Sequence, residues 1–357
     1  MSTLTVDHLG KRYGAACALD DVSMVFPAGR ITAVLGPSGS GKSTLLMAIA
    51  GLVRPDAGLV RLDGTDITGL PADRRGFGLV QQSYALFPHL DVLANAAFGL
   101  RCRGVARPER ERRSRIALDR LGITHLAARG IRQLSGGEQQ RVAIARAIAY
   151  DPPILLLDEP LAALDAQLRS GLRAELRRLV TDLGVTTVLV THDQSEAMEL
   201  GDQLAILRHG RLVQLGAPSA VYARPADAFV GRFLGAANLI PGTGVNGHAV
   251  DTALGRLLVA NPPPIGACWA MLRPEDLQVA TAADGGFQAQ CEQRLHLGDR
   301  LRLQVGVAGL RLTVDLPNDY RIEPGESLRL EPKPGRTIAM PRLPDEESPD
   351  DQRTTAP

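Results

Sequence analysis

The stretch that decides the fold is residues 36–44, which read Gly-Pro-Ser-Gly-Ser-Gly-Lys-Ser-Thr. Before it, Ile31 to Leu35 form a short apolar run that predicts a buried parallel strand. After it, residues 44–50 predict a helix, whose N-terminus carries a partial positive charge. The glycines in between allow the backbone to wrap around an anion with its N–H groups pointing inward. Strand, glycine-rich loop and helix in this order predict a phosphate-binding loop (P-loop) rather than a merely flexible linker.

Two side chains of this loop carry most of its expected chemistry. Lys42 would reach the β- and γ-phosphates of a nucleotide, and the Ser43 hydroxyl would hold Mg²⁺. We therefore expect ATP and Mg²⁺ as ligands. The nucleotide contacts expected from the loop are Gly36, Pro37, Ser38, Gly39, Ser40, Gly41, Lys42, Ser43 and Thr44.

A second motif, residues 134–141, reads Leu-Ser-Gly-Gly-Glu-Gln-Gln-Arg. Ser135 followed three residues later by Glu138 is the pattern of a capping box that opens a helix over residues 138–149. Capping alone does not explain Gly136 and Gly137, because glycine costs about 1 kcal/mol relative to alanine inside a helix. Bare N–H groups at a helix N-terminus are what close approach to a phosphate requires. The motif therefore predicts a second phosphate contact, with a simple capping box as the alternative.

Two carboxylates follow a predicted buried strand. The strand lies within Pro153 to Pro160 and delivers Asp158 and Glu159 at its carboxyl end, where open α/β sheets bind ligands. Asp158 suits the outer coordination of Mg²⁺. Glu159 can polarise a water molecule aimed at the γ-phosphate, which is the positioning task in phosphoryl transfer. The alternative is a solvated acidic pair.

Two other predicted strands also end in polar side chains. His192 follows the β-branched run Thr186 to Thr191 and can donate a hydrogen bond to the γ-phosphate, unless it is an ordinary surface histidine. Gln82 follows the strand Phe77 to Gln81 and can contact both Mg²⁺ and the attacking water. The expected catalytic residues are thus Lys42, Gln82, Glu159 and His192, and the expected metal contacts are Ser43, Gln82 and Asp158.

With these motifs in this order, residues 1–235 resemble the ATP-binding subunit of an ABC importer. The resemblance identifies residues 36–44 as Walker A, Ile154 to Glu159 as Walker B with Glu159 as general base, and residues 134–141 as the signature. It also makes Gln82 the Q-loop residue, Leu161 to Asp165 the D-loop and His192 the switch histidine. The further nucleotide contacts that it implies are Tyr13, which would stack on adenine, together with Ser135, Gly136, Gly137 and Asp165.

The resemblance also implies partners. In the family, two subunits pack head to tail, so that each ATP lies between the Walker A motif of one copy and Ser135, Gly136 and Gly137 of the other. We therefore expect a homodimer bound to two integral membrane permease subunits, which receive solute from a periplasmic or surface binding protein. The expected location is the cytoplasmic face of the inner membrane, as a peripheral protein.

Composition agrees with these expectations. The 357 residues are too many for one ordinary core and suit two domains. A net charge of +1 gives no argument for a nucleic-acid partner. The four cysteines are scattered, which fits a reducing compartment. No stretch is as apolar and long as a membrane span, and no signal sequence is evident at the N-terminus, so other chains should form the pore.

Regions outside the motifs complete the predicted organisation. Residues 84–150 should form a helical subdomain, in which the eight arginines of 101–120 face three acidic residues and predict a solvated helical surface. From Asn238 onward, short β-like runs alternate with Gly and Pro and predict a small all-β barrel over residues 236–343. Asn238 to Gly242 and Leu272 to Leu277 resemble the transport-associated OB domain of importer ATPases. The acidic tail, 344–357, should be disordered.

The predicted fold class is α/β, an ABC-type P-loop NTPase domain followed by a small all-β OB-like domain. Its favoured function is energising solute import. One alternative is a non-transport ABC ATPase acting on DNA or ribosomes, but such proteins usually have two cassettes or a long coiled coil between P-loop and signature. A second alternative is an exporter, which is disfavoured because exporters have fused membrane segments. Residues 82–100 and the OB-domain motifs named above are similar to the importer group for polyamines, ferric iron, sulfate or phosphonates. Within this group we expect spermidine/putrescine as cargo, with ferric iron second.

Overall fold

The structure is a computed structural model that describes residues 1–162, 166–245, 247–280 and 286–342, without the side chains of 166–170. Asp165 and the predicted disordered tail lie outside the described residues. The chain divides into two compact units, Met1–Val221 and Tyr222–Pro357. This division falls earlier than the expected boundary between residues 235 and 236.

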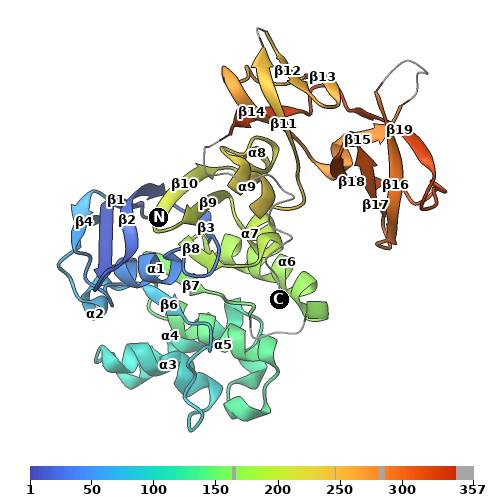
Figure 1. The fold of residues 1–357 in the computed structure, drawn as a ribbon. Helices are drawn as coiled ribbons and strands as arrows, with labels where there is room; N and C mark the ends of the chain where they lie inside the picture. Colours follow the sequence, from blue (N-terminus) through green and yellow to red (C-terminus); the bar gives the residue numbers. More distant parts are fainter. Residues whose placement is uncertain (163–165, 246, 281–285, 343–357) are drawn as a thin grey trace. The chain divides into compact units, whose positions relative to one another are not determined.

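The first unit contains two sheets (Figure 1). Four antiparallel strands follow in the order β2 (Ala16–Phe26), β1 (Leu4–Tyr13), β4 (Ala57–Leu62) and β5 (Thr65–Asp66). Six strands follow in the order β10 (Arg211–Gly216), β9 (Gln203–Arg208), β3 (Ile31–Leu35), β8 (Thr186–Thr191), β7 (Ile154–Asp158) and β6 (Gly78–Val80). In the second sheet, β10 pairs antiparallel and the other strands pair in parallel.

A single buried cluster joins the two sheets to helix α1 (Lys42–Ala50). It includes Phe26 from β2, Leu45 from α1 and Leu156 from β7. The central strands are rich in apolar and β-branched residues because they are buried on both faces, as β3 and β8 are at every position. The carboxyl ends of β3, β6, β7 and β8 therefore lie at one edge of a rigid sheet, where the sequence places its polar side chains.

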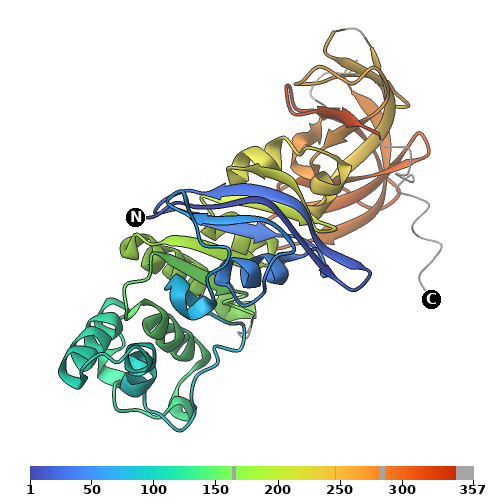
Figure 2. The same cartoon turned by 90° about the vertical axis from the view of Figure 1, so that its left-hand side faces the viewer.

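Helices α3 (Val92–Cys102), α4 (Arg107–Arg120) and α5 (Gly136–Ile148) form a lobe beside the sheets (Figures 1 and 2). Short 3₁₀ turns lie between α4 and α5, at Thr124–Leu126 and Ile131–Gln133. The remaining helices of this unit are α2 (Ala72–Arg75), α6 (Ala166–Leu183) and α7 (Gln194–Leu200), while α8 (Pro218–Ala223) spans the division between units. As expected for a solvated surface, most of the arginines on α4 are exposed or half-buried.

The second unit contains helix α9 (Ala228–Phe233), a 3₁₀ turn at Pro274–Asp276 and two antiparallel sheets. The first sheet has the order β13 (Gly255–Leu258), β12 (Ala249–Thr252), β11 (Asn238–Val245), β14 (Gly266–Leu272) and β20 (Ile338–Pro341). The second has the order β15 (Leu277–Val279), β19 (Ser327–Pro332), β16 (Phe287–His296), β17 (Leu301–Val307) and β18 (Leu310–Leu316). One apolar cluster draws on both sheets, for example Ile240 and Val305. The expected β-rich second domain is confirmed.

Candidate functional site

The P-loop connects β3 to α1 and is built around positions where a side chain does not fit. A Cβ added to Gly36 would lie 2.3 Å from the Leu207 carbonyl oxygen. Gly41, at φ 101°, would bring a Cβ within 2.3 Å of the Ala18 carbonyl oxygen. Gly41 is also the N-cap of α1 and no side chain caps this helix. The loop therefore presents backbone N–H groups and a helix N-terminus, which suit a phosphate.

Lys42 is nearly buried and folds back over this loop. Its Nζ donates to the carbonyl oxygens of Gly36 (2.8 Å) and Pro37 (3.0 Å). Burial lowers the pKa of Lys42, while the negative charges of Glu159 and Asp158 raise it in part. A polyphosphate bound beside Lys42 would favour the charged form of the amine. The buried hydroxyl of Ser40 has no hydrogen-bond partner within the described structure, so this donor set fits a nucleotide phosphate.

Glu159 contacts two other expected catalytic residues, Gln82 and His192. Its Oε2 accepts a hydrogen bond from Gln82 Nε2 at 2.9 Å, and its Oε1 lies 2.9 Å from His192 Nδ1. Glu159 has a left-handed backbone conformation (φ 45°), and its N–H donates to the Val190 carbonyl oxygen at 2.8 Å. A glutamate in this conformation is unusual and indicates a position under functional constraint. The ends of β6, β7 and β8 thus place Gln82, Glu159 and His192 in one hydrogen-bonded cluster.

Asp158 lies next to this cluster at the end of β7. Burial is the main cause that raises its pKa, the neighbouring Glu159 raises it further, and Lys42 lowers it. A cation bound at the strand ends would therefore stabilise the charged carboxylate. The Ser43 hydroxyl and the Gln82 amide oxygen are the kind of oxygen ligand that Mg²⁺ prefers, and the Asp158 carboxylate suits its outer coordination.

The signature motif forms both the cap and the first turn of α5. Glu138 N–H donates to Ser135 Oγ at 3.3 Å, and Ser135 N–H donates to Glu138 Oε2 at 2.7 Å. Gly136 and Gly137 are the first residues of the helix, which therefore starts before the expected residue 138. Within the described residues, no hydrogen bond joins these three signature residues to the P-loop of the same chain.

Tyr13 lies at the end of β1 with 49% of its surface exposed, and Lys11 Nζ lies 5.5 Å from its ring centroid. An exposed ring is free to stack on a base. Among the other expected nucleotide contacts, Ser38, Gly39 and Thr44 lie in the loop and the first turn of α1.

Sequence reasoning missed three residues around the cluster. Tyr84 is buried and its hydroxyl donates to the Pro160 carbonyl oxygen at 3.1 Å. Glu196 is buried, accepts a hydrogen bond from Thr191 Oγ1, and has a pKa that burial raises to about 7. Arg146 donates to the carbonyl oxygens of Tyr84 and Ala85. Of these three residues, only Glu196 had a possible signal in the sequence, because it lies four residues after His192. Taken alone, that position is typical of an ordinary residue at the start of a helix.

Comparison with known proteins decides the family. The family model for ABC transporters matches residues 19–162, and the TOBE domain model matches residues 270–340. The sulfate/thiosulfate import ATP-binding protein CysA of Burkholderia pseudomallei is 43% identical over 350 residues, which cover 94% of this chain and 99% of the relative. This chain belongs to the ABC transporter family. It is the ATP-binding, ATP-hydrolysing subunit of an ABC importer.

Two other similarities agree with this membership. The Fe(3+) ions import ATP-binding protein FbpC of Streptomyces coelicolor is 42% identical over 339 residues, covering 95% of this ABC ATPase and 94% of the relative. Among solved structures, the dimeric ABC transporter cassette MJ0796 is 34% identical with a TM-score of 0.53, covering 60% of this chain and 98% of that one. No helix in the described part of the chain is long and apolar enough to span a bilayer.

Proposed function

We propose that this ABC ATPase uses Mg²⁺-ATP to drive sulfate or thiosulfate import through two separate membrane permease subunits, supplied by an external solute-binding protein. It would act as a peripheral protein on the cytoplasmic side of the plasma membrane. The observation that carries the hydrolytic part is the hydrogen-bonded cluster of Gln82, Glu159 and His192 beside Lys42.

Each residue of this cluster has a proposed role. Glu159 accepts the proton of the attacking water as general base, and Gln82 and His192 orient Glu159 and the γ-phosphate. Lys42 neutralises the β- and γ-phosphates. Ser43, Gln82 and Asp158 would hold Mg²⁺, which supplies charge neutralisation at the phosphates when bound.

The signature motif supports a site shared between two copies. Ser135, Gly136 and Gly137 offer a helix N-terminus but have no hydrogen bond to their own P-loop in the described structure. We assign them to the ATP held by the P-loop of a second copy, with Asp165 also in the shared interface. Tyr13 would stack on the adenine of its own copy. The dimeric cassette among the similar structures supports this arrangement.

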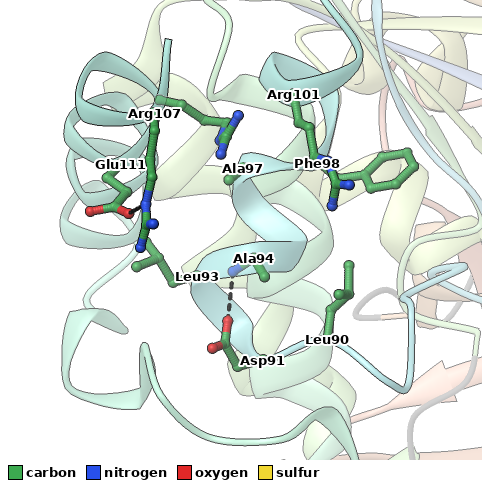
Figure 3. A pocket seen from close by; sticks show the side chains of 10 residues that line it. Leu90, Asp91, Leu93, Ala94, Ala97, Phe98, Arg101, Arg107 and Glu111 are labelled. Carbon is green, nitrogen blue, oxygen red and sulfur yellow. Dashed lines mark hydrogen bonds and ion pairs between the residues drawn. The ribbon is translucent and has the colours of Figure 1, made fainter. Parts of the chain in front are cut away.

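A cavity of about 370 Å³ in the helical lobe is our candidate for the permease contact (Figure 3). Its lining combines apolar side chains such as Leu93 and Phe98 with charged ones such as Arg101, Arg107 and Glu111. Arg107 is paired with Glu111 at 2.9 Å, and Asp91 caps α3 by accepting from the Ala94 N–H. A lining of mixed apolar and charged side chains suits an amphipathic helix of a membrane subunit.

The cargo rests on the relatives, because the transported solute would contact the permease and the binding protein. Similarity over nearly the whole chain favours sulfate or thiosulfate. Ferric iron is the second candidate, because a relative named for it matches almost as well. The expectation of polyamine import receives no support from these relatives.

Uptake measurements test the proposal. Cells lacking this gene should lose uptake of radiolabelled sulfate and thiosulfate, while uptake of ferric iron and spermidine stays normal. The wild-type gene should restore uptake and a Glu159→Gln gene should not. Loss of iron or spermidine uptake, with sulfate uptake intact, would overturn the cargo assignment.

A further inference from the structure

The loop after β6 contains two consecutive residues in an unfavourable backbone conformation. Tyr84 has φ 60° and Ala85 has φ 45°, both in the left-handed region. Side chains with a Cβ atom avoid this region because the Cβ approaches the following carbonyl oxygen. Two such residues in succession persist only when surrounding contacts hold them.

The contacts on one side come from Arg146 of helix α5. Its Nη1 donates to the Ala85 carbonyl oxygen at 2.6 Å, and its Nη2 donates to the Tyr84 carbonyl oxygen at 2.7 Å. The guanidinium also lies over the ring of Phe87, 5.7 Å from its centroid. The planar fork of arginine matches two neighbouring acceptors in a way that a lysine amine does not.

The other side of the loop faces the hydrolytic cluster. The Tyr84 hydroxyl donates to the carbonyl oxygen of Pro160, the residue directly after Glu159. Gln82, two residues before Tyr84, donates to the Glu159 carboxylate. The loop of Tyr84 and Ala85 therefore lies between Arg146 on one side and the Gln82–Glu159 contact on the other.

We propose that Arg146 is a positioning residue for ATP hydrolysis, which holds Tyr84 and Ala85 so that Gln82 and Glu159 meet in working geometry. The inference rests on the proposed roles of Gln82 and Glu159. Because α5 begins with the signature residues, Arg146 also ties the signature helix to the hydrolytic cluster of the same copy. A shift of that helix on closing against a second copy would reach the cluster through these two hydrogen bonds.

Arg146→Met tests this role, because methionine keeps much of the length and removes both donors. Turnover should fall about 10- to 100-fold, as for a small misplacement of reacting groups, while ATP affinity stays within about twofold. Arg146→Lys should recover part of the turnover. The matched control is Arg103→Met: Arg103 lies 3.8 Å from the Tyr150 ring centroid in the same lobe and has no hydrogen bond to residues 81–87 in the described structure. It should keep normal turnover.

A second substitution separates positioning from general stability. Glycine adopts the left-handed region freely, so Ala85→Gly added to Arg146→Met should raise turnover about threefold or more over Arg146→Met alone. Wild-type turnover in Arg146→Met would overturn the inference, as would equal loss of affinity and turnover without rescue by Ala85→Gly. Glu159→Gln, assayed in parallel, shows which idea has failed: normal turnover there sinks the proposed hydrolytic roles, whereas a stalled Glu159→Gln beside a normal Arg146→Met sinks this inference alone.

Discussion

The P-loop and the signature motif both present a helix N-terminus, but the charged side chains of Lys42, Asp158 and Glu159 lie together at the P-loop. Lys42 lies near Asp158 and Glu159, close enough for their charges to affect its pKa, and Glu159 contacts Gln82 and His192. At the signature, the hydrogen bonds of Ser135 within the described residues go to Glu138 and to the helix that it caps.

On the proposed shared site, this difference explains why one chain would bind ATP but would need a second copy to hydrolyse it. The P-loop end carries the cation and the proton acceptor. The signature end carries helix N-terminal N–H groups, and within the described residues these have no hydrogen bond to the P-loop of the same chain. Substitutions at the two ends should therefore fail in different ways, and the following predictions use that contrast.

Lys42→Ala should have the largest effect, because it removes the buried cation from the P-loop end. We expect ATP affinity to fall and turnover to drop about 100-fold or more. Equilibrium binding of a fluorescent ATP analogue and a phosphate-release assay measure the two quantities. Unchanged affinity with normal turnover would contradict the assignment of the P-loop.

Glu159→Gln should separate binding from chemistry at the same end. The amide cannot accept a proton, so turnover should fall about 100-fold or more while ATP affinity is retained. An ATP-bound dimer should then accumulate on size-exclusion chromatography. Near-normal turnover would place the general base elsewhere.

Glu196 should have a smaller effect, visible in stability rather than in ATP binding. Its pKa is raised from 4.5 to about 7, chiefly by burial, so the folded state keeps a proton that the unfolded chain releases. The free energy of unfolding should therefore decrease as pH rises from 4.5 to 7, by about 3 kcal/mol at most. Urea denaturation at pH 5 and pH 8 measures this loss, and Glu196→Gln should lack it. An equal pH dependence in both proteins would contradict a buried, protonated Glu196.

The parts predicted from sequence are those with a strong local pattern. The runs expected at Ile31–Leu35 and Thr186–Thr191 are β3 and β8 with the same bounds, because strands buried on both faces are rich in apolar and β-branched residues. In the second unit, no sequence pattern predicted β12, β13, β15 or β20. These strands have three or four residues each, and β20 is fixed by pairing with the distant β14, as in Met271 with Ile338.

The site residues that sequence reasoning missed were missed for the same reason, because their roles depend on contacts between segments far apart in the chain. Arg146 reads as one more arginine on an amphipathic helix, and only its contact with carbonyl groups about 60 residues earlier reveals a different role. Tyr84 likewise acts through its left-handed backbone, which a sequence pattern does not display. The roles of Gln82, Glu159 and His192 remain predictions, although the structure brings them into one cluster.

The central claim is that each nucleotide site combines the P-loop of one copy with the signature of the other. Ser135→Arg places a bulky side chain at the signature, so it should spare ATP binding and block hydrolysis. Mixed with Lys42→Ala protein, it forms dimers in which one site has both defects and the other has neither. If a single intact site can fire on its own, random pairing predicts that the equimolar mixture recovers about a quarter of wild-type turnover, although each variant alone should be inactive. Normal turnover by Ser135→Arg alone would contradict the shared site.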